Sequence, residues 1–407
     1  MLSSSGPEPV AYRLTYTLID LEACRFEGSV EIDLVCREAA ATAITLNSKE
    51  LQIISATIGS ENEQRATATG VAFDFENERA TITFASSIIG STTLSIVFSG
   101  ILNSDLEGFY RSFYTDERGI RRAMAVTQFE PTAARRAFPC FDEPALKATF
   151  ELTIVAPIAT PGGGVLRVVS NMPILSTKRI SRPVIGTPSD AIASKEWRFQ
   201  RTPRMSTYLV GICIGEFDEV ATTTCAGVPV RVMTPVGQSE LGLFALEIAT
   251  KSIELFESEK CFGIKYADSL PKCDLLAIPD FAAGAMENWG MITYRSSRLL
   301  VDEESSTLGS CIRSARTTAH EIAHMWFGNL ATPGVCECVC VCVLFTAFLF
   351  VPPSSRDGSH SPLRLPSPFL SAPPPPLSLS LSLSLSRVVD APLAQRRLRA
   401  IHGVRCT

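Results

Sequence analysis

The sequence predicts a large, mainly β N-terminal domain with antiparallel strands, followed by an α/β domain and then by a tail of unrelated composition. These units are expected at residues 1–220, 221–333 and 334–407. Three observations predict this division. Apolar and polar residues alternate through the first unit, helical spacing begins after about Val220, and the composition changes at Pro333.

The composition excludes several classes of protein. The chain has 407 residues, of which 46% are hydrophobic and 19% charged, unlike collagen, a disordered acidic tail or a small disulfide scaffold. The net charge of −5 gives no sign of nucleic-acid binding through bulk charge. Residues 1–333 carry a net charge of −9, whereas residues 334–407 carry +4 and contain no lysine.

Strands in the first unit are predicted from a period of two. Tyr12, Leu14, Tyr16 and Leu18 alternate with polar residues, which indicates a strand with one buried face. The same pattern recurs in several later stretches. These are residues 26–34, 82–84, 94–98 and 197–199, with a further apolar strand expected at 208–214.

The second unit mixes helices and strands. Apolar spacing predicts a helix over 239–257 and another from Leu308 to Asn329, ended by Gly328-Asn329. Between them, Cys273–Ile278 and Met291–Tyr294 are expected to be strands.

The N-terminus and the cysteines indicate a cytoplasmic protein. No secretory signal is visible, and no apolar run reaches the 18 residues of a transmembrane segment. The eight cysteines before residue 334 lack paired spacing, which favours reduced, mostly buried thiols. The oligomeric state is left open.

The helix expected after Leu308 contains His320-Glu321-Ile322-Ala323-His324. Residues i and i+4 share one helix face, so both imidazoles can reach one metal ion, with Zn²⁺ as the expected cofactor. Glu321 can then act as a general base toward an attacking water. Two unrelated helix histidines are the alternative, and the chain has only four histidines in total.

Two further stretches carry carboxylates that could join this site. Gly284-Ala285-Met286-Glu287-Asn288 lies between two expected strands, and Gln128-Phe129-Glu130-Pro131 lies in the β-domain. Taken alone, each is a weak signal, because a glutamate in a glycine-containing loop is commonly a solvated surface residue.

Together these motifs resemble the zinc aminopeptidases of the aminopeptidase N and puromycin-sensitive type. That family carries a Gly-Ala-Met-Glu-Asn loop followed by a His-Glu-x-x-His helix, and both stand here in that order. The stretch Thr127 to Pro144 is also similar, and the resemblance runs from about Pro9 to Pro333. It implies a saddle-like β-sandwich followed by an incomplete thermolysin-like catalytic domain.

The resemblance also implies roles for these residues. His320 and His324 would bind zinc, and Glu321 would be the catalytic base. Glu287 and Glu130 would hold the free α-amine of a peptide substrate, with Gln128 in the same pocket, since two carboxylates can pair with one ammonium. The rest of the 284–288 loop, Gly284, Ala285, Met286 and Asn288, would line the substrate site, and the small residues would allow close approach of a peptide backbone.

The pattern of the family fails after Pro333. Its third zinc ligand is a glutamate 19 residues after the second histidine, where this chain has Val343. A downstream tyrosine that stabilises the oxyanion in the family has no counterpart either. We therefore expect a truncated chain that binds zinc weakly and has little or no activity.

The tail has the composition of a translated intron. Residues 334–343 alternate valine and cysteine as a GT repeat would encode, and Leu377–Ser386 is a run of Leu-Ser pairs that a CT repeat would encode. A one-base shift after Arg387 permits Glu-Trp-Trp and then Asn-Glu-Gly, which would return the third-ligand glutamate to its expected position. A cysteine metal site at Cys336, Cys338, Cys340 and Cys342, or a Pro/Ser-rich linker, are the alternatives.

Three other functions remain open at this level. The first is an inactive fragment that acts as a binding or dominant-negative partner. The second is a bifunctional enzyme of the leukotriene-hydrolase type, against which Ala285 argues, because that type carries Gly-Gly-Met-Glu-Asn. The third is an endopeptidase of the thermolysin type, against which Glu287 and Glu130 argue.

Overall fold

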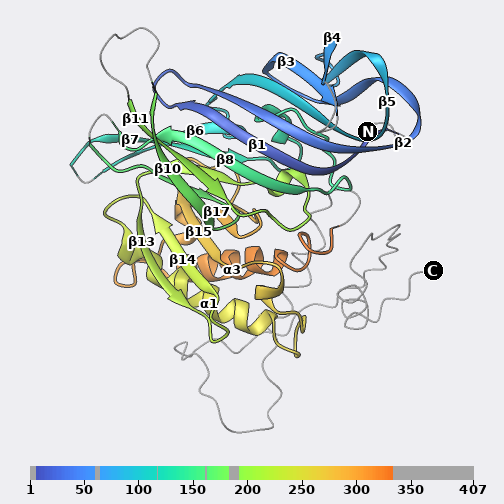
Figure 1. Cartoon of the computed structure of the whole chain (residues 1–407). Coiled ribbons are helices and arrows are strands. Elements are labelled where there is room, and N and C mark those ends of the chain that lie inside the picture. The colour runs from blue at the N-terminus through green and yellow to red at the C-terminus, as the bar shows by residue number, and fades with distance from the viewer. Residues whose placement is uncertain (1–5, 60–64, 117, 161–162, 183–191, 333–407) are drawn as a thin grey trace.

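The computed structural model describes residues 6–59, 65–116, 118–160, 163–182 and 192–332. These residues form three β-sheets and a small group of helices. The long N-terminal strands occupy one end, and the helices α1 and α3 lie at the other, beside β13 and β14 (Figure 1). The expected mainly β fold with a following α/β region is confirmed.

The largest sheet has eight strands in the order β10-β11-β8-β1-β2-β5-β3-β4. All its pairings are antiparallel except that of β1 with β8, which is parallel. The alternation predicted for the first strand is confirmed for Tyr12, Leu14 and Tyr16, which are buried. It was wrong for Leu18, which is half-buried, because a register shift after Tyr16 puts Ile19 in the core instead. Its strands are β1 (Glu8–Asp20), β2 (Arg25–Asn47), β3 (Leu51–Gly59), β4 (Ala66–Asp74), β5 (Arg79–Ile101), β8 (Thr149–Pro157), β10 (Ile174–Arg182) and β11 (Ile192–Phe199).

Aromatic side chains fill the core under this sheet. Tyr12 stacks on Phe150 with ring centroids 4.8 Å apart, and Tyr16 packs edge-on against Phe26 at 5.6 Å. The Tyr16 hydroxyl donates to the carbonyl of Ala137 at 3.1 Å, just after the 3-10 turn η1 (Ala134–Arg136). This bond satisfies the one polar atom of a fully buried ring.

A second sheet of four strands has the order β6-β7-β12-β9. It consists of β6 (Gly108–Thr115), β7 (Arg121–Gln128), β9 (Arg167–Ser170) and β12 (Ile212–Gly215). The strand expected over 208–214 was wrong in its first half, because η2 (Thr207–Leu209) forms a 3-10 turn and the strand begins at Ile212. The apolar run there is buried without being extended throughout.

The third sheet has five strands in the order β13-β14-β15-β17-β16. It is mixed, since β14, β15 and β17 run parallel while the two edge strands run antiparallel. The strands are β13 (Asp218–Thr223), β14 (Pro229–Thr234), β15 (Cys273–Ile278), β16 (Ala285–Met286) and β17 (Met291–Arg295). The positions of β15 and β17 match the two predicted strands, whereas the residues of β16 were expected to form a loop.

The helical elements pack against this sheet. They are η3 (Ser239–Gly242), α1 (Leu243–Phe256), η4 (Tyr266–Asp268), α2 (Ser296–Leu299) and α3 (Leu308–His324). Helix α3 begins where Thr307 accepts a hydrogen bond from the backbone of Ser310 at 3.2 Å. Its predicted end at Asn329 was five residues too late, because the chain turns back after His324 through Gly328 at φ 122°.

The turn after α3 is anchored by Trp326. Its indole stacks on Phe262 at 5.4 Å, lies edge-on to Phe256 at 6.2 Å, and donates to the carbonyl of Ile264 at 3.0 Å. Met325 and Trp326 therefore continue the buried apolar pattern of α3 without continuing the helix. That is why apolar spacing alone overestimated the helix length.

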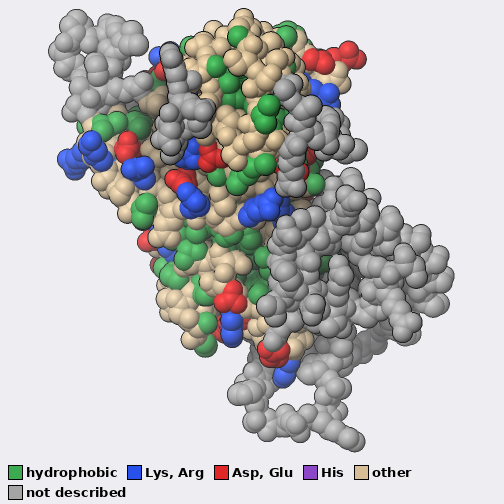
Figure 2. Space-filling view, turned by 45° about the vertical axis from the view of Figure 1, so that its right-hand side comes forward, with side chains coloured by type: hydrophobic (Ala, Val, Ile, Leu, Met, Phe, Trp, Pro, Cys, Tyr) green, Lys and Arg blue, Asp and Glu red, His purple; other side chains and the backbone are tan. Residues whose placement is uncertain are grey.

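The molecular surface mixes charge signs. On the face shown in Figure 2, basic and acidic side chains are interspersed among apolar and other residues. Within the described residues, every helix falls short of the length and hydropathy that a bilayer-spanning segment requires.

Candidate active site

Helix α3 carries the two histidines on one face, as its period requires. The Nε2 atoms of His320 and His324 lie 3.1 Å apart, and the ring planes are nearly perpendicular at 89°. If a metal ion lay at the usual zinc–nitrogen distance of about 2.05 Å from both atoms, the nitrogen–metal–nitrogen angle would be about 100°. This angle is close to tetrahedral, so the pair fits one zinc ion.

Both imidazoles are neutral at physiological pH. Burial lowers the pKa of His320 to about 4, with further contributions from His324 and Arg316. Burial likewise lowers the pKa of His324. Neutral rings keep a free nitrogen lone pair, which is the form that binds a metal.

The orientation of His324 is fixed by the turn that follows it. Its Nδ1 lies 3.2 Å from the carbonyl of Phe327, so Nδ1–H donates there and Nε2 keeps its lone pair. Gly328 lies against the same ring, since a Cβ at this position would be 2.8 Å from Nδ1. A glycine is therefore needed both for the backbone angle and for the space.

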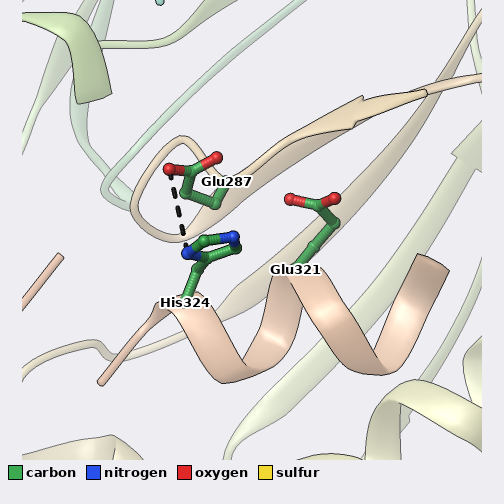
Figure 3. A group of neighbouring side chains, drawn as sticks. All are labelled: Glu287, Glu321 and His324. Atoms are coloured by element: carbon green, nitrogen blue, oxygen red, sulfur yellow. Dashed lines mark ion pairs between the residues drawn. The ribbon is translucent and has the colours of Figure 1, made fainter. Parts of the chain in front are cut away.

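Figure 3 shows Glu287 reaching toward α3 from the loop, while Glu321 and His324 project from the helix on the same side. Glu287 Oε1 lies 4.0 Å from His324 Nδ1. One ligand atom from each of Glu287, Glu321 and His324 lies within 4.8 Å of the others. Oxygen and nitrogen donors of this kind suit a divalent cation such as zinc.

The two carboxylates are buried, and burial raises both of their pKa values. That of Glu287 rises to about 7. That of Glu321 rises well above its usual value through burial first, then through the charges of Glu287 and Glu130. Crowded, desolvated carboxylates favour a cation between them, either a metal ion or an ammonium group.

The Gln128-x-Glu130 stretch reaches this site from the end of β7. The charge of Glu130 acts on both Glu321 and His324, which places its carboxylate toward α3. Gln128 is 7% exposed, and its Oε1 atom is buried without a hydrogen-bond partner among the described residues. An unpartnered buried acceptor is costly, and it is available to a ligand that brings a donor.

The loop around Glu287 is held by its backbone carbonyls. The carbonyl of Gly284 accepts from the backbone of Arg295 at 3.0 Å, and that of Trp289 accepts from the Asn171 side chain at 2.9 Å. The amine of Lys272 donates to the carbonyl of Gly290 at 2.8 Å. This loop is therefore fixed by Asn171 just after β9, Lys272 just before β15 and Arg295 at the end of β17 before any substrate binds.

The remaining loop residues differ in exposure. A Cβ at Gly284 would meet nothing within 4 Å, so this position opens into free space, and Ala285 is half-buried. Met286 is fully buried. Asn288 donates to Thr293 Oγ1 at 3.1 Å, and its Oδ1 has no partner in the described part of the chain.

The structure thus brings together residues that lie far apart in the sequence: His320, Glu321 and His324 on the helix, Glu287 on the loop, and Gln128-x-Glu130 from the β-domain. Sequence reasoning missed the residues that hold them, which are Asn171, Lys272 and Asn329. Asn329 was interpreted only as a helix stop. Val343 and the tail from residue 334 lie outside the described residues, so the missing ligand and the translated intron stay predictions.

Comparison with known families agrees with this fold and this set of residues. Residues 8–209 match the Peptidase M1 N-terminal domain, and residues 244–349 match the Peptidase family M1 domain. The fold and the histidine helix are those of a peptidase. The chain belongs to peptidase family M1.

The curated relatives are named aminopeptidases. Aminopeptidase M1-A of Oryza sativa subsp. japonica is 44% identical over 320 residues, covering 77% of this chain and 34% of the relative. Aminopeptidase 2, mitochondrial, of Saccharomyces cerevisiae is 40% identical, and the puromycin-sensitive aminopeptidase of Caenorhabditis elegans is 37% identical; each match covers 80% of this chain and 32% of the relative. The chain therefore spans about a third of the length of the relatives it matches.

Proposed function

We propose that this chain carries the amine-recognition and metal-binding parts of a zinc aminopeptidase, which removes N-terminal residues from peptides. The observation that carries the proposal is the 3.1 Å separation of the two histidine Nε2 atoms, with the Glu287 carboxylate 4.0 Å from His324. A metal-binding pair and an anionic pocket then stand side by side.

Recognition of the substrate would come from the anionic pocket. Glu287 and Glu130 pair with the ammonium at the peptide N-terminus, and the unpartnered Gln128 Oε1 accepts a hydrogen bond from one of its N–H groups. An internal peptide bond offers no such cation. The pocket thus selects for exopeptidase substrates and sets the register so that one residue is removed.

The chemistry would take place on α3. His320 and His324 would hold zinc, which when bound polarises the scissile carbonyl and makes water more acidic. Glu321 takes a proton from the attacking water and passes it to the leaving amine. Its raised pKa suits a group that must accept a proton and later donate it.

A second proposal is that this chain is only weakly active, because Val343 stands where the family has its third zinc ligand. Two histidines leave the metal one protein ligand short of the three usual in catalytic zinc sites. The chain would then act as a binding or dominant-negative fragment. Its buried free thiols Cys140, Cys213 and Cys273 are compatible with a reducing compartment, and we place it in the cytoplasm.

Hydrolysis of leucine anilide and N-acetyl-leucine anilide in the presence of zinc tests both proposals. A chain translated from the transcript with the inferred insert removed should cleave only the free-amine substrate. The 407-residue chain should be slower by at least about 100-fold, or about 2.7 kcal/mol of transition-state stabilisation. Equal rates for the two chains would contradict the weak-activity proposal, and equal cleavage of N-acetylated peptides would favour a thermolysin-type endopeptidase.

A further inference from the structure

Asn329 connects the metal helix to the loop that carries Glu287. Its backbone N–H donates to the carbonyl of His324 at 3.0 Å, and its side-chain Nδ2 donates to the carbonyl of Glu287 at 2.9 Å. The residue is fully buried. One residue, through its backbone N–H and its side chain, therefore connects the two segments that the site must keep in register.

Asn329 is itself held from the β-domain. The amine of Lys147, which precedes β8, donates to the carbonyl of Asn329 at 3.0 Å and to that of Leu330 at 3.4 Å. The hydroxyl of Thr332 also donates to the Asn329 carbonyl, at 3.2 Å. With its backbone fixed on both sides, the amide of Asn329 has little freedom to follow a shift of the loop.

We propose that Asn329 is a positioning residue that sets the location of Glu287 relative to His324. The role in substrate selection rests on the proposed function, whereas the positioning itself does not. A carboxylate that pairs with an ammonium must be placed to within a fraction of an ångström, and a shift of about 1 Å at a distant support can cost about 100-fold. Asn329 touches the backbone of Glu287, not the substrate.

Amide hydrogen exchange on the full 407-residue chain tests the positioning. Asn329→Ala removes the donor to Glu287, and exchange in residues 284–290 should become at least threefold faster while α1 is unchanged. The matched control is Asn103→Ala, which removes an amide that donates to the carbonyl of Glu107 at 3.0 Å, a bond that does not involve residues 284–290. That control should leave exchange at 284–290 as in the wild type.

Binding of leucinamide and N-acetyl-leucinamide supplies the second readout. Asn329→Ala should weaken binding of leucinamide at least tenfold and leave binding of the acetylated compound unchanged, whereas a general packing role would change both. Asn329→Ser, which keeps a short donor, should recover part of the loss. If wild type binds both compounds equally, the proposed function fails, yet the exchange experiment still decides the positioning.

Three results would overturn the proposal. The first is wild-type exchange at 284–290 in a folded Asn329→Ala chain. The second is an equal rise in exchange throughout α1 and the five-stranded sheet. The third is loss of folding in both Asn329→Ala and Asn329→Ser, which would mean that Asn329 serves only to stabilise the core.

Discussion

The Nε2 atoms of His320 and His324 approach to 3.1 Å, and Glu287 Oε1 lies 4.0 Å from the Nδ1 atom of His324. Two neutral imidazoles at this distance either share one N–H···N hydrogen bond or direct both lone pairs at a cation. Burial lowers the pKa of both rings, which disfavours protonation. A metal ion bound by both lone pairs would replace that hydrogen bond and satisfy both nitrogens.

Loss of either histidine should weaken further the zinc binding that this chain retains. His320→Ala and His324→Ala should each weaken zinc affinity by at least about 100-fold, since even outer-shell partners of a metal site cost roughly 10- to 100-fold. Zinc titration with a competing chelator measures this change. His360→Ala removes a histidine outside the helix pattern and should have no effect. Equal affinities in all the variants would contradict the assignment of the two ligands.

Gly328→Ala should disturb His324 directly. The backbone at Gly328 has φ 122°, and the new Cβ would lie 2.8 Å from His324 Nδ1. We expect a loss of about 1–3 kcal/mol in the free energy of unfolding and about tenfold weaker zinc binding. Urea denaturation and zinc titration measure these two effects.

Gly119→Ala is the matched control for backbone strain without a clash. Gly119 also has a positive φ of 76°, but a Cβ there meets nothing within 4 Å. It should cost about 1 kcal/mol in the free energy of unfolding and leave zinc affinity unchanged. If both alanine variants bind zinc equally well, Gly328 does not support His324.

Glu287→Gln should remove selection for the free amine. A hydrogen bond to a charged partner is worth about 1.5–3 kcal/mol, so leucinamide should bind roughly 10- to 100-fold more weakly. Calorimetric titration measures this. Glu257→Gln is a control of similar burial, since Glu287 is 5% and Glu257 7% exposed. Equal loss in both variants would mean that the charge of Glu287 has no specific role.

Lys147 should make the stability of the fold depend on alkaline pH. Burial, helped by the charge of Arg204, lowers the pKa of its amine to about 8, below the unfolded value of about 10.4. Between these two values the unfolded chain binds more protons than the folded one. The contribution of Lys147 to the free energy of unfolding therefore rises with pH across this window, by about 1–3 kcal/mol.

Lys147→Met should remove that rise. The difference in the free energy of unfolding between wild type and variant, measured by urea denaturation at pH 7.5, 9 and 10.5, should grow in favour of wild type as pH increases. Comparing the two chains cancels the other groups that titrate in this range. A constant difference would mean that Lys147 keeps an ordinary pKa in the folded state.

Local patterns in the sequence predicted much of this fold. The alternation in β1 reflects one buried face, a pattern that repeats every two residues, whereas β15 was predicted from a short run in a strand that is buried throughout. The C-terminal end of α3 could not be predicted from apolar spacing. Met325 and Trp326 are buried in the turn, so the apolar spacing continues after the helix has ended.

The part of the site that lies within one short stretch of sequence could be predicted. His320 and His324 share a helix face because of their spacing, so the sequence alone indicated that they meet. The supports of Glu287 had no such signal. Asn171 and Asn329 act through single hydrogen bonds to carbonyls that are 118 and 42 residues away in sequence, and no local pattern encodes such a contact.

The most direct measurement of the central claim is binding of leucinamide and N-acetyl-leucinamide to the 407-residue chain. It needs no turnover, so a missing third zinc ligand does not affect it. The pocket formed by Glu287, Glu130 and Gln128 should bind leucinamide at least about 100-fold more tightly, because acetylation removes the cation. Equal affinity for the two compounds would contradict an aminopeptidase site.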